Sequence, residues 1–255
     1  MINAREERTT GPMTWRESGQ SDGPWSAFGR PGGDWHGTRP TFENPLTWSL
    51  SLARIGGILV RVHVLFLLFA VVELLRSLAG APAGEAYSVN PLQVLSMLVA
   101  LFLLVLLHEF GHCVACRRVG GSADEILMWP LGGLAMCYPG EAARAHLITA
   151  LGGPAVNLAI CFVLGGVLVA TTGIWWEVAV PNPVSPFSGL RHDAIASSAA
   201  LTMAYWMHAL SLLLLLFNLL PMFPLDGGRI LHAMLWPKLG YANALRLAVR
   251  AGFVG

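Results

Sequence analysis

The sequence predicts an all-α polytopic membrane protein, a bundle of about four to six transmembrane helices with a small β-hairpin or sheet element at the cytoplasmic side. Two features of the composition favour this class. Of the 255 residues, 55% are hydrophobic and only 12% are charged, whereas about 25% of the residues in soluble domains are charged. The mean hydropathy is +0.58, and the apolar residues are gathered in long segments. These features argue against a water-soluble protein.

Four apolar segments are each long enough to cross a bilayer, because about 20 helical residues span ~30 Å of hydrocarbon. We place these segments at 62–82, 92–116, 146–172 and 199–220. A further apolar segment begins at Leu245 and runs to Gly255, which predicts that the chain is cut short at its C-terminus.

A polar region precedes the apolar segments. Residues 1–46 contain seven glycines, five prolines and no apolar periodicity, which is typical of a disordered tail. We therefore divide the chain into a disordered cytoplasmic tail, 1–46, and a membrane domain, 47–255. At the start of this domain, Trp48–Val62 alternates in part between apolar and polar residues and contains the pair Gly56–Gly57. This combination predicts a short hairpin or an interfacial strand before the first span.

The positive charges predict the orientation in the membrane, because Lys and Arg flanks are retained on the cytoplasmic side. Of the 16 Lys and Arg residues, 14 lie before the first span, between the second and third spans, or after the fourth, and only Arg76 and Arg191 lie towards the opposite side. The N-terminus and the loop 117–145 should therefore be cytoplasmic. The net charge is only +1, so we expect the lipid bilayer and no nucleic acid among the partners.

The second apolar segment contains the motif HEFGH, with His108, Glu109 and His112. Residues four apart lie on one face of a helix, so both imidazoles can bind one Zn²⁺ while Glu109 lies beside the metal as a base. Ionisable side chains in a membrane helix cost about 2.5–3.5 kcal/mol when charged and usually have a function. The alternative is a pair of hydrogen-bonded histidines at a helix contact. At 1.5 Å per residue, His108 lies roughly 24 Å from the outer face and several ångströms below the cytoplasmic one.

A catalytic zinc ion needs a third protein ligand and one open position. Cys116 continues the spacing of the two histidines, but the three positions span roughly 12 Å of helix and zinc bonds are only about 2.0–2.3 Å long. We therefore expect Cys113 and Cys116 to be small apolar packing residues. Asp226 is the better candidate, because Pro221 and Pro224 break the apolar run ahead of it and such a break can direct a carboxylate inward. The alternative for Asp226 is an ordinary turn residue.

The motif GGPAVN, Gly152–Asn157, opens the third apolar segment. Small residues allow helices to approach closely, and the amide of Asn157 would be costly in lipid unless it faced a polar partner. Simple helix packing is the alternative for this motif. Four further histidines lie in or near the spans, and we expect them to bond the backbone or interfacial water rather than a metal: His63, His146, His208 and His232.

The motifs HEFGH, GGPAVN and NLLPMFPLDGG, in this order, resemble those of the site-2 protease family of intramembrane zinc metalloproteases. The resemblance covers about Trp48 to Gly255 and is closest to the compact prokaryotic branch that includes the sporulation pro-sigma-factor processing protease. It implies a multi-pass protein of the prokaryotic inner membrane, with one Zn²⁺ per chain near the cytoplasmic side. It also implies the site residues: His108, His112 and Asp226 as zinc ligands, Glu109 as catalytic acid/base, and Asn157 in holding the substrate or the developing oxyanion.

The resemblance implies an endopeptidase that cuts in or near the transmembrane segment of a membrane-anchored protein, with a regulator of transcription as the expected substrate. The strand-like stretch Ile126–Met136 would accept an unwound substrate at its edge and present it to the metal. Two alternatives stay open. One is a zinc transporter, which has no need of a base such as Glu109, and the other is a non-catalytic membrane scaffold. The substrate's identity and the oligomeric state are left open.

Overall fold

A computed structural model describes residues 48–79, 90–130, 132–179, 181 and 188–254. The chain divides into two units, residues 1–41 and residues 42–255, and every described residue belongs to the second. The predicted disordered tail, 1–46, lies outside the described residues. The proposed boundary of the membrane domain therefore stays a prediction.

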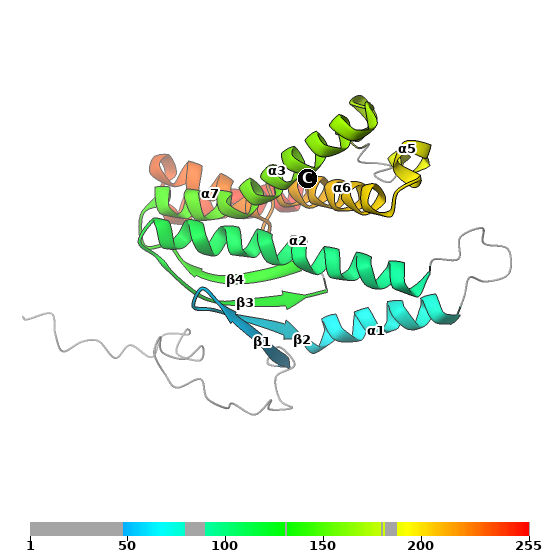
Figure 1. Cartoon of the computed structure of the whole chain (residues 1–255). Helices are drawn as coiled ribbons and strands as arrows, with labels where there is room; N and C mark the ends of the chain where they lie inside the picture. The colour runs from blue at the N-terminus through cyan, green and yellow to red at the C-terminus, as the bar shows by residue number, and fades with distance from the viewer. Residues whose placement is uncertain (1–47, 80–89, 131, 180, 182–187, 255) are drawn as a thin grey trace, which may run out of the picture. The chain divides into compact units, whose positions relative to one another are not determined.

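Helices dominate the described part of the chain, and the long helices α2, α3 and α6 are drawn side by side (Figure 1). The helices begin and end as follows: α1 Val64–Ala79, α2 Pro91–Arg118, α3 Ala143–Thr172, α4 Trp176–Ala179, the short 3-10 helix η3 Ser188–Arg191, α5 Asp193–Ala196, α6 Ala199–Asn218, α7 Asp226–Leu239 and α8 Tyr241–Val254.

Within the described residues, three helices are long and apolar enough to cross a membrane: α2, α3 and α6. They match the second, third and fourth predicted spans, so the predicted multi-pass helical class is confirmed. The first predicted span, 62–82, differs. Its first two residues belong to a strand, and residues 80–82 lie outside the described residues. The described helix α1 has 16 residues, which is about 24 Å and less than the ~30 Å of the hydrocarbon core.

A small sheet accompanies the helices. Its four strands, in the order β1-β2-β3-β4, are β1 Ser49–Ile55, β2 Ile58–His63, β3 Ser122–Trp129 and β4 Gly132–Tyr138. The predicted hairpin is confirmed, because β1 and β2 pair antiparallel around Gly56 and Gly57, which both have positive φ. Strands β2 and β3 are parallel, as expected when helices connect them.

The predicted strand-like stretch Ile126–Met136 is not a single strand. It contains the turn of a second hairpin, in which β3 and β4 pair antiparallel with Ile126 opposite Ala135. One face of the sheet packs on α2, and the shared core includes Val60, Ile126 and Cys113. Arg117 holds the two hairpins to the end of α2, since its guanidinium donates hydrogen bonds to the carbonyls of Gly56 at 2.6 Å and Ala123 at 2.6 Å.

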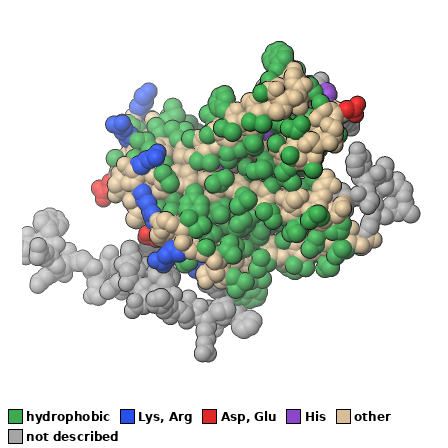
Figure 2. Space-filling view, in the orientation of Figure 1, with side chains coloured by type: hydrophobic (Ala, Val, Ile, Leu, Met, Phe, Trp, Pro, Cys, Tyr) green, Lys and Arg blue, Asp and Glu red, His purple; other side chains and the backbone are tan. Residues whose placement is uncertain are grey.

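The surface supports a membrane location for this unit. Figure 2 shows hydrophobic side chains over most of the visible face, while Lys and Arg gather at one end, where α2 runs into β3. Strand β1 also exposes apolar side chains, with Leu50 59% and Leu52 62% exposed. Exposed apolar residues on this scale are typical of a protein whose solvent is lipid.

Candidate metal centre and active site

Helix α2 carries the two histidines on its buried face. His108 and His112 are 4% and 2% exposed, and their Nε2 atoms lie 3.1 Å apart. Each Nε2 also lies near Oδ2 of Asp226, at 3.0 Å for His108 and 3.1 Å for His112. Within the described residues, these three form the one group of His, Cys, Asp or Glu side chains with ligand atoms close enough to hold a metal ion. The predicted ligand set therefore comes together from α2 and α7.

Glycines bring α3 against α2 at the level of the histidines. A Cβ on Gly111 would overlap the carbonyl of Gly152, and a Cβ on Gly152 would overlap the carbonyl of Gly111, so the two backbones touch. This contact places the Thr149 carbonyl 2.8 Å from Nδ1 of His112. A hydrogen bond from Nδ1 to a carbonyl fixes the tautomer that leaves the Nε2 lone pair free for a metal.

A break between α6 and α7 positions Asp226. Helix α6 ends at Asn218, as the prolines predict, and α7 begins at Asp226 itself. The two glycines that follow allow the turn to close, because a Cβ on Gly227 would overlap the carbonyl of Leu220 and one on Gly228 would lie 2.7 Å from the carbonyl carbon of Met222.

The donor set fits zinc. Two imidazole nitrogens and one carboxylate oxygen are common zinc ligands, and tetrahedral ligands at zinc bond lengths lie about 3.3 Å apart, close to the 3.0–3.1 Å between these three atoms. Two neutral imidazole lone pairs that face one carboxylate repel each other unless a cation lies between them. A three-ligand set also leaves the fourth position of the ion open.

Glu109 lies next to this group and faces the sheet. Its side chain is buried, at 7% exposure, and Oε2 accepts a hydrogen bond of 2.9 Å from the backbone N–H of Ala135 in β4. A Cβ on Gly133 would overlap Cγ of Glu109, so a side chain at that position would displace the carboxylate. The free edge of β4 and the carboxylate of Glu109 therefore meet beside the metal ligands.

Comparison with known proteins identifies the family. The model of peptidase family M50 matches residues 96–254, more than half of the chain. The chain belongs to peptidase family M50. This family thus accounts for α2 through α8, including all three metal ligands and Glu109.

Individual relatives agree with the M50 assignment. Zinc metalloprotease MJ0392 of Methanocaldococcus jannaschii is 31% identical over 209 residues, which cover 81% of this chain and 51% of the relative. Rip3 of Mycobacterium tuberculosis is 32% identical over 211 residues, covering 81% and 48%. The chain thus spans about half the length of these curated relatives. A solved site-2 protease from M. jannaschii is similar in fold, with a TM-score of 0.50 and 28% identity over 79% of this chain and 78% of that one. Similarity to the sporulation branch stays a prediction.

Asn157 is brought to the same face of α3 as the metal site. It follows Gly153 by one turn, and a Cβ on Gly153 would overlap Nε2 of His112. Asn157 is 0% exposed, and neither Nδ2 nor Oδ1 of its amide has a hydrogen-bond partner. A buried amide without a hydrogen-bond partner costs free energy, and a ligand that bonds to this amide would remove that cost. Its predicted role in this M50 chain stays a proposal.

The cysteines of α2 do not join the metal group. Cys113 and Cys116 are both 0% exposed within the core shared by α2 and the sheet, and Sγ of Cys116 donates to the carbonyl of Ser122 at 3.3 Å. Their predicted role as packing residues fits this position.

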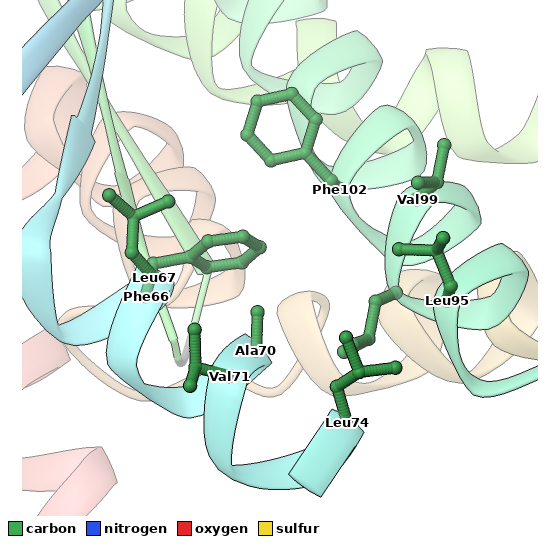
Figure 3. A pocket seen from close by; sticks show the side chains of 9 residues that line it. Phe66, Leu67, Ala70, Val71, Leu74, Leu95, Val99 and Phe102 are labelled. Carbon is green, nitrogen blue, oxygen red and sulfur yellow. The ribbon is translucent and has the colours of Figure 1, made fainter. Parts of the chain in front are cut away.

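An apolar groove lies elsewhere in the M50 fold. It has a volume of about 290 Å³ and lies between α1 and α2. Figure 3 shows its lining, with Leu74 from α1 and Leu95 from α2. The Phe66 and Phe102 rings approach to 5.5 Å in the same region. Every residue in its lining is hydrophobic, so this groove does not supply catalytic or metal-binding groups.

Several residues that shape the site were missed by the sequence reasoning. The backbone groups of Thr149 and Ala135 hold His112 and Glu109, and Gly133 and Gly153 leave room for the side chains of the site. Backbone donors and acceptors have no residue signature. The glycine pairs in PLGGLAM and GGPAVN were the sequence features that could have indicated where the site needs space.

Proposed function

We propose that this chain is a zinc-dependent intramembrane endopeptidase that hydrolyses a peptide bond in or near the transmembrane segment of a membrane-anchored protein. The observation that carries the proposal is that three features lie side by side. They are the metal ligands His108, His112 and Asp226, the carboxylate of Glu109, and the free edge of strand β4. Family membership supports the peptidase chemistry. A regulator of transcription is the proposed substrate class.

The residues of the site have distinct tasks in this reaction. His108, His112 and Asp226 would hold the zinc ion, which when bound supplies a Lewis acid that polarises the scissile carbonyl and makes water acidic. Glu109 takes the proton from the attacking water and returns it to the leaving amine. Asn157, whose Nδ2 lacks a partner, donates to the oxygen of the scissile carbonyl.

Strand β4 binds the substrate in this proposal. In an antiparallel strand the N–H and C=O of one residue point to the same side, and the side alternates along the strand. Because the N–H of Ala135 points away from β3 to Glu109, the free edge of β4 carries the backbone groups of Gly133, Ala135 and Cys137. An unwound substrate segment can pair with this edge, and it then takes the N–H of Ala135 and releases Glu109 for catalysis.

We place the N-terminus and the active site towards the cytoplasm. Helix α2 has 28 residues, about 42 Å, so one end extends beyond ~30 Å of hydrocarbon. The end with Arg117 and Arg118 is the one at which Lys and Arg gather (Figure 2). Positive residues favour the cytoplasmic side, and His108 lies only ten positions before Arg118.

The Glu109→Gln variant tests the enzyme. Membranes that contain the wild-type chain or this variant are compared for peptide fragments by mass spectrometry, and zinc in the purified proteins is measured. We expect one zinc ion per chain in both proteins and a cleavage rate at least about 100-fold lower in the variant, because general acid–base catalysis contributes that much.

A matched control is Glu73→Gln, since Glu73 is paired with Arg76 on α1 at 3.2 Å and takes no part in the proposed chemistry. Fragments that persist in zinc-loaded Glu109→Gln membranes would show that Glu109 is not the base. If the wild-type chain produced no peptide fragments but carried zinc into vesicles, a zinc transporter would be favoured.

A further inference from the structure

A polar cavity of about 180 Å³ lies beside the metal site, among β4, α3, α7 and α8. Two of its lining residues connect it to the ligands. Thr149 holds His112 through its carbonyl, and Arg229 follows Asp226 by three positions on α7. The polar lining is completed by His146, His232 and Tyr241, and Cys137 lines it from β4.

Arg229 is the one permanently charged side chain in the described lining, and it is a cation. Arg229 has no carboxylate within ion-pair distance in the described ranges of the chain, and the lining contains no Asp or Glu. His232 lies 5.6 Å from the ring of Trp236 and 4.9 Å from that of Tyr241. Burial and the neighbouring His146 lower the pKa of His232, so its imidazole is more readily neutral and Arg229 supplies the positive charge of the cavity. The cavity therefore favours an anion.

One polar atom in the cavity wall lacks a partner. His232 is only 6% exposed, and its Nε2 atom has no hydrogen-bond partner. A buried nitrogen without a partner costs about 1–3 kcal/mol. A ligand with an oxygen atom in the cavity would remove this cost and would pair with Arg229 at the same time.

Strand β4 connects the cavity to the proposed substrate path. Ala135 and Cys137 share the free edge of β4, and residues two apart on a strand are separated by about 6.8 Å. Residues directly opposite each other on paired strands have side chains on the same face. When one substrate residue is opposite Ala135, the substrate residue two positions along is opposite Cys137. The side chain of Cys137 lines the cavity, so the side chain of that second substrate residue enters the cavity.

We propose that this cavity is a subsite for a carboxylate side chain, Asp or Glu, located in the substrate two residues from the position that pairs with Ala135. This inference rests on the proposed peptidase function and names a feature of its substrates. Arg229 is the residue that determines the specificity, and His232 supplies the second polar contact. Strand β4 continues from Ala135 through Cys137 within the loop 117–145, which we place on the cytoplasmic side. The carboxylate therefore lies on the cytoplasmic side of the substrate residue that pairs with Ala135.

The test uses synthetic transmembrane peptides of Leu and Ala, with an Asn-Gly pair at the cytoplasmic end and Glu, Gln or Lys at one variable position that is moved along the flank. The zinc-loaded protein is placed in phosphatidylcholine vesicles. At one position we expect kcat/KM to be about tenfold higher for Glu than for Gln, the size of one charge-assisted hydrogen bond. Arg229→Gln should reduce this ratio to about one, and Arg229→Glu should favour Lys.

The control is Arg246→Gln, because the Arg246 guanidinium bonds to Asn243 at 2.7 Å on α8 and is not part of the lining; it should keep the wild-type ratio. Equal rates for all three peptides, or a Glu preference that survives in both Arg229 variants, would overturn the subsite. A rate that depends on anionic lipid and not on the peptide residue would assign the cavity to a headgroup phosphate and would also overturn it.

Binding separates this inference from the proposed function. Fluorescence anisotropy of the labelled peptides with the Glu109→Gln protein measures affinity without turnover, and Glu should bind about tenfold more tightly than Gln. If the wild type cleaves no peptide while this preference is present, the peptidase proposal fails and the carboxylate site stands. If cleavage occurs and no affinity preference is found, the subsite alone is wrong.

Discussion

Single glycines determine how much space the metal site has. Gly153 lies so close to the ligands that a Cβ would overlap Nε2 of both His108 and His112. Those two nitrogens are the atoms that bind zinc, so the hydrogen side chain of Gly153 keeps the ion's position accessible. Gly166, on the same helix, has no atom within 4 Å of its added Cβ.

We expect Gly153→Ala to lower zinc affinity at least about tenfold. The added methyl group forces both Nε2 atoms away from the point at which they bind the ion, and zinc bonds tolerate deviations of only about 0.2 Å. Competition with a chelator and metal analysis of the purified protein measure this. Gly166→Ala is the control and should bind zinc like the wild type. Wild-type affinity in Gly153→Ala would mean that α3 can move away from α2 at this level.

Among the elements, β4 has the most direct effect on the proposed reaction. Its inner edge pairs with β3, and the N–H of Ala135 on its outer edge is bonded to Glu109. A proline is tolerated on a strand where the lost N–H faces away from the sheet. Ala135→Pro therefore removes one outward donor and leaves the pairing with β3 in place.

We expect Ala135→Pro to lower kcat/KM about tenfold through loss of one substrate hydrogen bond, with zinc content unchanged. Ala135→Ser keeps the N–H and is the control. Unchanged kcat/KM in Ala135→Pro would exclude pairing of the substrate with β4.

At the scale of the whole molecule, the distribution of charge predicts the orientation in the membrane. We expect Glu141→Cys to react with a membrane-impermeant thiol reagent only after the cytoplasmic side is opened, and Ser197→Cys to react in intact spheroplasts. Both positions are exposed, while Cys113, Cys116 and Cys161 are buried. The unmodified protein gives the background from Cys137. Reversed labelling would place the active site near the outer face.

The sequence predicted the ligands better than it predicted their surroundings. HEFGH and LDGG contain the chemistry within a few neighbouring residues, so His108, His112 and Asp226 could be named without a structure. The pair Gly56–Gly57 likewise marked the first hairpin. The second hairpin was missed, because Ile126–Met136 is apolar almost throughout and has no change of periodicity at its turn.

Features assembled from several elements were also missed. The cavity next to the metal site takes Cys137 from β4, His146 from α3, Arg229 from α7 and Tyr241 from α8, and no local pattern connects these positions. The sequence reasoning ended the fourth span at 220, did not predict α7, and predicted only an apolar segment from Leu245 where α8, Tyr241–Val254, lies. Helix α7 starts at the metal ligand itself, and the two glycines directly after Asp226 gave no sign of a helix, which is why an ordinary turn was the alternative there.

The backbone contact between Gly111 and Gly152 has an evolutionary consequence. Where two helices meet through their main chains, the spacing of the groups they carry does not depend on the sizes of neighbouring side chains. Drift in the surrounding lipid-facing residues can then proceed without changing the distance between His112 and the Thr149 carbonyl. Many substitutions should be tolerated at the lipid-facing positions around the metal site and very few at Gly111 and Gly152. Active chains selected from a library of random variants should therefore differ in their lipid-facing residues and keep both glycines.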